Sequence, residues 1–187
     1  MNKRGKMTTQ IKILGAAGSV TGSRFLLEHN TKKYLIDCGL FQGKREFKKL
    51  NWQPFPISPS EIDGVIITHA HIDHTGYLPR LVKEGFNGPV YATNSTVELM
   101  KILLMDSAHL QERDAYYANK YGYSKHKPAL PLYTADDAQA ALSLLQPVSY
   151  HQELALDDIR VIWRPAGHIL GSAIIEILVP VEQGIKK

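Results

Sequence analysis

The chain has 187 residues, of which 44% are hydrophobic and 21% are charged, and its formal net charge is +4 at pH 7. This composition is ordinary for one globular domain and excludes a largely disordered chain. The charge is compatible with a polyanionic partner but is too small to demonstrate one. The single cysteine, Cys38, cannot form an internal disulfide, so a reducing cytoplasm is the simpler expectation.

Residues 1–10 carry three basic side chains but lack the apolar stretch that a signal peptide needs. We expect them to form a flexible tail, followed by one domain over residues 11–187. No later window of the sequence has the composition of a membrane-spanning run, so we expect no membrane partner.

The first predicted elements are strands. Residues 11–14 alternate as a strand does, and a glycine-rich loop follows at residues 15–23. The segments 24–28 and 33–37 flank a polar turn, which indicates an antiparallel hairpin and argues against a doubly wound parallel sheet. The glycine-rich loop could cradle a phosphate, but its spacing matches neither common phosphate-binding motif. A simple tight connection is the alternative.

The middle of the chain predicts helices that alternate with a strand. Residues 78–85 have helical spacing and a terminal glycine, and residues 89–93 read as a strand. Ser95 and Glu98 form a capping-box pattern, which predicts a helix from there to about Tyr121.

The last third of the chain predicts one helix and three strands. Thr134 is expected to begin the helix, which runs through Leu145. Strands are then expected at residues 148–156, 159–165 and 172–180.

Four potential metal ligands lie within six residues of one another, in the sequence THAHIDH at positions 68–74. The apolar run before them reads as a buried strand. If that strand continues through residue 69, His69 and His71 point to the same side and can hold one metal ion together. Asp73 and His74 follow where the chain turns and can reach an adjacent position. Imidazole and carboxylate ligands without a thiolate suit zinc or a similar transition ion. The alternative is a polar loop whose histidines cap a strand and a helix.

The pattern His69-x-His71-x-Asp73-His74 resembles the signature of metallo-β-lactamase-fold hydrolases. Two further segments are similar to that family, the strand end at residues 34–39 and the loop at residues 166–172. Other short sequence segments resemble the β-CASP branch of this family. This branch contains RNA-processing nucleases related to the cleavage-and-polyadenylation endonuclease. The segments lie at residues 37–43, 105–109, 131–134 and 167–172.

This resemblance implies an α/β fold of the α+β type, an αββα sandwich with mostly antiparallel or mixed sheets. It implies that His69, His71 and His168 hold one zinc ion. Asp73 and His74 would hold a second ion and form the catalytic pair of a hydrolase that cleaves RNA phosphodiester bonds. Asp37 would accept the N–H of a ligating imidazole without touching the metal. His168 lies between glycines in a strand connection, and this position also favours a role for it as a metal ligand.

Members of the family carry further elements, namely an aspartate that bridges both metals, a cap domain and a final histidine ligand. We therefore expect residues 11–187 to be an N-terminal portion, truncated before the cap domain and partnered by a missing C-terminal portion. The second metal site would then be incomplete, and this chain alone would cleave RNA poorly or not at all. An exposed sheet edge would also favour a homodimer.

Two alternatives to an RNA nuclease remain at this point. One is a hydrolase of the same fold that acts on a small ester, thiolester or lactam. The other is a non-catalytic module that binds RNA or a partner protein. Single-stranded RNA is the expected partner in the leading interpretation, and the tyrosines and lysines of residues 116–127 could contact it. The same side chains could equally belong to one side of a packed helix.

Overall fold

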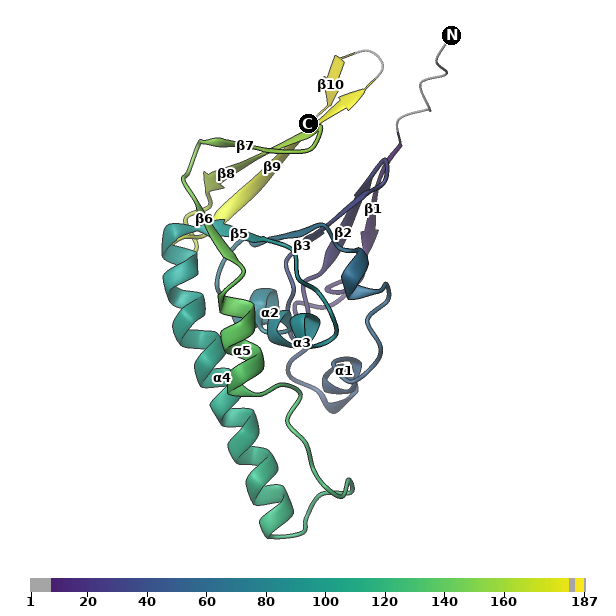
Figure 1. Cartoon of the computed structure of the whole chain (residues 1–187), viewed down its shortest axis with the longest axis vertical. Coiled ribbons are helices and arrows are strands. Elements are labelled where there is room, and N and C mark those ends of the chain that lie inside the picture. The colour runs from purple at the N-terminus through teal and green to yellow at the C-terminus, as the bar shows by residue number, and fades with distance from the viewer. Residues whose placement is uncertain (1–7, 182–183, 187) are drawn as a thin grey trace.

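Figure 1 shows the computed structural model of the protein, which describes residues 8–181 and 184–186. The first strand, β1, already includes Thr9 and Gln10. The first strand therefore begins two residues earlier than the strand predicted at residues 11–14. Residues 1–7 of the expected tail lie outside the described residues.

The described residues form five α-helices, one short 3-10 helix and ten strands. The helices are α1 (Arg45–Leu50), α2 (Ile72–Thr75), α3 (Leu78–Lys83), α4 (Asn94–Lys120) and α5 (Ala135–Leu142), with the 3-10 helix η1 at Pro59–Glu61. The strands are β1 (Thr9–Ile13), β2 (Phe25–His29), β3 (Lys32–Ile36), β4 (Gly64–Ile66), β5 (Val90–Thr93), β6 (Leu145–Val148), β7 (Glu153–Leu156), β8 (Ile159–Pro165), β9 (Ala173–Val181) and β10 (Gly184–Lys186).

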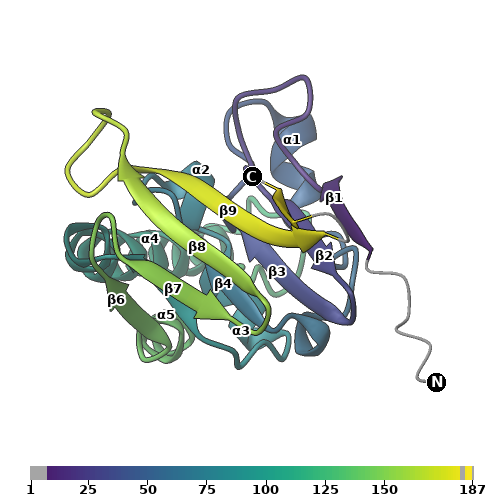
Figure 2. The ribbon, with the colours of Figure 1, turned by 90° about the horizontal axis from the view of Figure 1, so that it is seen from above.

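The strands form two sheets. The larger has the order β1-β2-β3-β4-β5-β6, and the smaller has the order β10-β9-β8-β7. Pairing is antiparallel from β1 to β3, parallel from β3 to β6 and antiparallel throughout the smaller sheet. Figure 2 shows the smaller sheet lying over the larger one. The molecule therefore has the predicted α+β fold with mixed sheets.

Strand alternation divides the larger sheet between two hydrophobic cores. Leu35 and Val65 face the core that contains α3, α4 and α5, whereas Tyr34 and Ile66 face the core shared with the smaller sheet. Successive strand residues point to opposite faces, so β3 and β4 each contribute to both cores. Trp163 of β8 is fully buried and donates a hydrogen bond to the carbonyl of Ile67 at 3.1 Å. This contact fixes the smaller sheet beneath the end of β4.

Three predicted boundaries around the histidine motif and α4 differ from the structure. Strand β4 ends at Ile66, so His69 and His71 are not on a continuing strand. Helix α2 begins at Ile72 and includes Asp73 and His74, whereas the sequence predicts a turn at these two residues and a helix only after them. The N-cap of α4 is Thr93, whose hydroxyl accepts a hydrogen bond from Thr96 N at 3.4 Å. Ser95 therefore does not cap the helix.

The end of α5 is also earlier than predicted. Thr134 and Asp137 form a capping box at its start, but the helix stops at Leu142 and Leu145 begins β6. Strand β6 pairs in parallel with β5, because a hydrogen bond from Val90 N to the carbonyl of Leu144 draws the chain into the sheet. The predicted strand at residues 148–156 thus contains only the last residue of β6, a turn, and the whole of β7.

In the described part of the chain, no helix combines the length and the apolar composition needed to cross a membrane.

Cys38 is fully buried, and burial raises the pKa of its thiol to about 12. Because the thiolate is the nucleophilic form, Cys38 should not react with a thiol reagent in the folded protein at neutral pH. Labelling with Ellman's reagent should therefore appear only on unfolding in denaturant. Rapid stoichiometric labelling of the folded chain would show that the thiol is accessible.

Candidate metal centre

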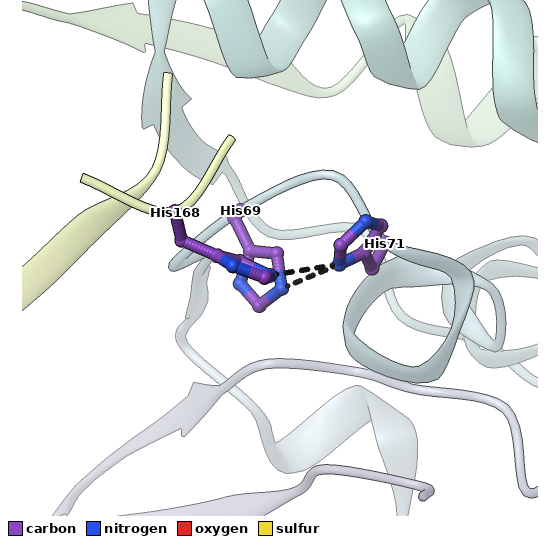
Figure 3. A group of neighbouring side chains, drawn as sticks. All are labelled: His69, His71 and His168. Carbon is purple, nitrogen blue, oxygen red and sulfur yellow. Dashed lines mark hydrogen bonds between the residues drawn. The ribbon is translucent and has the colours of Figure 1, made fainter. Parts of the chain in front are cut away.

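Three imidazole rings meet at the end of β4. His69 Nε2 lies 3.1 Å from His71 Nδ1, and His168 Nε2 lies 3.2 Å from the same atom. One ring nitrogen from each of the three lies within 4.8 Å of the others. Figure 3 shows that they converge from two segments, the motif after β4 and the loop between β8 and β9. Residues almost 100 positions apart are thus brought to one point.

The geometry of this triad fits a metal ion. Nδ1 of a neutral imidazole has one in-plane lone pair, so His71 cannot accept good hydrogen bonds from both His69 and His168 at once. A cation at the centre would satisfy all three lone pairs. Zinc–nitrogen bonds of about 2.0–2.1 Å in a tetrahedron place the nitrogens about 3.3–3.4 Å apart. Two of the three separations, 3.1 and 3.2 Å, are close to that requirement, and the third is no more than 4.8 Å.

Thr68 orients His69. Its backbone N–H donates to Asp37 Oδ1 at 2.9 Å, which takes the place of a strand hydrogen bond and ends β4. The Thr68 hydroxyl donates to the same carboxylate and lies 2.9 Å from His69 Nδ1. If the hydroxyl accepts from Nδ1–H, the lone pair of His69 is left on Nε2, the atom that faces the triad.

Burial of His69 lowers the pKa of its imidazole to about 4, and the neighbouring histidines add to this effect against the opposing charge of Asp37. The ring is therefore neutral at pH 7. A neutral imidazole is the form that binds metal, so no proton has to be displaced from His69 before it can act as a ligand.

Asp37 also holds His74. Its Oδ2 lies 2.7 Å from His74 Nδ1, and the carboxylate is only 2% exposed. Burial lowers the pKa of His74, but the hydrogen bond from its ring to Asp37 and the charges of Asp37 and Asp73 outweigh burial and raise it. His74 Nε2 is free to face Asp73, whose Oδ2 lies 3.7 Å away. Asp73 and His74 thus place a second group of potential ligand atoms next to His69.

The backbone of α2 is held by the loops that follow β1 and β3. Ser23 N donates to the carbonyl of Asp73 at 2.8 Å, and Cys38 N donates to the carbonyl of His74 at 2.7 Å. Gly39 lies so close to this helix that a Cβ atom on it would be 1.6 Å from the carbonyl oxygen of Asp73. Only glycine fits here, because any side chain would push the two backbones apart.

The loop that carries His168 is fixed by hydroxyl groups. Ser172 Oγ accepts hydrogen bonds from the backbone N–H of His168 at 3.1 Å and of Ile169 at 3.2 Å. The hydroxyls of Thr93 and Thr96 donate to the carbonyl of Gly171 at 2.7 and 3.0 Å. Thr93 and Thr96 are buried at the start of α4, so this helix positions the third histidine.

Sequence reasoning missed these supporting hydroxyls. Thr68 and Ser172 stand beside predicted ligands, and hydroxyl side chains at strand ends were the available signal. Thr93 and Thr96 had no signal in the sequence, because their partner Gly171 lies more than 70 positions away.

Removing His168 should weaken zinc binding at least about tenfold, since the triad would keep two of its three ligands. The test is competitive titration of His168→Ala against a chromogenic zinc chelator. His151→Ala is a suitable control, because this histidine is exposed and contacts Arg164 instead of the triad. Stoichiometric zinc retained with unchanged affinity in His168→Ala would remove His168 from the site.

Of the tyrosines predicted to contact RNA, Tyr116 and Tyr117 lie in the C-terminal part of α4, and Tyr121 and Tyr123 follow its last residue. This end of α4 is the one away from α2 in Figure 1. The rings of Tyr117 and Tyr121 stack with centroids 6.0 Å apart and planes 9° apart. Lys120 Nζ lies 5.7 Å from the ring of Tyr116 and 5.6 Å from that of Tyr121. All three rings are at least 41% exposed, so they form an aromatic and basic surface that is separate from the metal centre.

The chain is similar in sequence to RNA-processing proteins. It is 40% identical to ribonuclease TTHA0252 of Thermus thermophilus over 86% of this chain and 33% of that protein. It is 31% identical to cleavage and polyadenylation specificity factor 73 of Drosophila melanogaster over 90% of this chain and 23% of that protein. The chain thus spans a third or less of the length of these relatives.

The fold is similar to that of a solved B3 metallo-β-lactamase with an active-site glutamic acid, at a TM-score of 0.55 and 16% identity, covering 97% of this chain and 59% of that one. Residues 19–166 match the metallo-β-lactamase superfamily. This match includes the motif after β4, and its relatives are RNA-processing proteins. The chain therefore belongs to the metallo-β-lactamase superfamily and, within it, to the β-CASP branch of RNA-processing proteins.

Proposed function

We propose that the chain carries the metal centre of a zinc-dependent hydrolase that cleaves phosphodiester bonds in single-stranded RNA. The observation that supports this most is the convergence of His69, His71 and His168, with ring nitrogens within 4.8 Å of one another. Similarity to a ribonuclease supports RNA as the substrate. His69, His71 and His168 would hold one ion and leave a fourth position open, as catalytic zinc sites do.

The chemistry that bound zinc supplies is Lewis acidity, which lowers the pKa of water and neutralises phosphate charge. Asp37 keeps His69 and His74 in the tautomers that present Nε2, through Thr68 in one case and directly in the other. Asp73 and His74 would hold a second ion close to the first. Two ligands hold an ion less firmly than three, so we expect tight binding of at most one zinc per chain.

The test measures zinc per chain and then hydrolysis of single-stranded RNA beside a chromogenic ester. We expect one tightly bound zinc and only weak RNA cleavage by this chain alone, which increases as zinc is added beyond one equivalent because the second ion is held by two ligands. EDTA should abolish the cleavage, as should the double substitution of His69 and His71 by alanine. Hydrolysis of the ester but not of RNA would favour the small-ester alternative. Zinc and RNA binding without any hydrolysis would favour a binding module.

A further inference from the structure

A groove lies beside the metal centre, between the glycine-rich loop after β1 and the segment that leads into α1. Its volume is about 570 Å³, which is within the range of pockets that take small ligands. Asp73 lines it, so the groove opens onto the position proposed for the second ion. The side chains that matter most are those of Val20, Thr21, Gln42, Lys44, Phe47 and Asp73.

The two walls of the groove are tied together. The hydroxyl of Thr21 donates to the carbonyl of Leu40 at 3.2 Å, and it accepts from the backbone N–H of Gln42 at 2.7 Å. Ser23, at the end of the same wall, donates its backbone N–H to the carbonyl of Asp73. The groove and the metal ligands thus share one hydrogen-bonded framework, so a ligand would find the walls already formed.

The groove combines apolar, aromatic and cationic side chains. Val20 is 95% exposed, so its apolar side chain is open to a ligand. Phe47 on α1 is partly buried, and Lys44 is exposed. Lys44 Nζ lies 3.9 Å from Glu46, but such an exposed pair contributes little and leaves the ammonium free to meet an anion. A base that packs on apolar and aromatic surface, joined to a phosphate that meets an ammonium, fits this combination.

We propose that this groove binds one nucleotide of single-stranded RNA next to the phosphate that is cleaved. Lys44 contacts the backbone phosphate, and Val20 and Phe47 contact the base. The proposal rests on the proposed function, because a nucleotide binds in this groove for cleavage only if the adjoining metal centre cleaves RNA. The tyrosine surface on α4 fits this position less well, because it lies at the end of the helix away from α2 (Figure 1).

Binding of the zinc-loaded protein to a fluorescently labelled single-stranded RNA tests the proposal, with the RNA checked on a gel after each titration. Lys44→Ala should weaken binding by about threefold to tenfold at low salt and reduce the slope of log affinity against log salt by about 0.7. Lys49→Ala is the matched control, since this lysine is exposed on α1, the helix that Lys44 precedes, and does not line the groove. It should change affinity less than twofold, and zinc content should be unchanged in both variants.

Photocrosslinking locates the base independently. RNA that contains 4-thiouridine should crosslink to the peptides carrying Val20 or Phe47. Crosslinks confined to the tyrosines of α4, or equal effects of Lys44→Ala and Lys49→Ala, would overturn the groove proposal. Either result would leave the nuclease proposal standing if RNA cleavage still depends on His69 and His71. The nuclease proposal itself would be overturned if RNA were not hydrolysed, or if hydrolysis did not depend on His69 and His71.

Discussion

Replacing Gly39 with alanine should reduce RNA cleavage by about a hundredfold, because a displacement of about 1 Å at a catalytic site can cost that much. The new Cβ would lie 1.6 Å from the carbonyl oxygen of Asp73, a distance that no pair of atoms can keep. The backbones must separate, which disturbs the hydrogen bonds from Ser23 and Cys38 that hold α2. Overpacking of this kind also costs about 1–3 kcal/mol of the free energy of unfolding.

Gly64→Ala provides the matched control. Gly64 is buried in β4, close to the same motif, but a Cβ there would meet the carbonyl oxygen of Pro89 at an ordinary 3.4 Å. Both variants should be compared by initial rates of RNA cleavage and by urea unfolding. Equal behaviour of Gly39→Ala and Gly64→Ala would show that the contact between Gly39 and α2 does not position Asp73 and His74.

Asp37→Asn should lower zinc affinity by about tenfold to a hundredfold while the fold persists. The carboxylate accepts hydrogen bonds from Ser23 Oγ, from the backbone and hydroxyl of Thr68 and from His74 Nδ1, so every described partner is a donor. An asparagine of the same shape puts an NH₂ group where one of these donors points. The Thr68 hydroxyl can accept from this NH₂ group and turn its own hydrogen toward His69 Nδ1, which moves the proton of His69 to Nε2 and removes its lone pair from the metal side.

Asparagine also tolerates the positive backbone φ of 57° at residue 37, so backbone strain should not confuse the result. Asp63→Asn is a control for the loss of one carboxylate, because Asp63 interacts with Lys32 away from the histidines. Zinc affinity is measured by chelator competition, and unfolding is followed by circular dichroism. An unchanged affinity in Asp37→Asn would indicate that Asp37 merely forms a turn.

The sequence predicted the elements of the fold and the cluster of ligands better than it predicted their boundaries. The apolar run before His69 and the glycines around His168 are local features. In the folded protein the first forms strand β4 and the second lie in the loop between β8 and β9, as predicted. The end of β4 could not be predicted in the same way. It depends on Asp37, which lies 31 positions before Thr68 in the chain and accepts a hydrogen bond from its backbone N–H.

The cap of α4 shows the same limit. Ser95 and Glu98 form a good local capping pattern, but Thr93 caps the helix because its hydroxyl also donates to Gly171 O. That contact joins the helix to the loop of His168. Likewise α5 ends at Leu142 because the residues after it are recruited into the sheet beside β5. In both cases tertiary hydrogen bonds override a local preference.

The central claim is that His69, His71 and His168 form one metal site. An anomalous difference map collected at the zinc edge, from crystals grown with zinc, tests it most directly. We predict a peak about 2.0–2.1 Å from one ring nitrogen of each histidine, with Asp37 making no contact to it. A map with no peak among the three rings, or with a zinc ion that Asp37 coordinates directly, would contradict the site described for this protein.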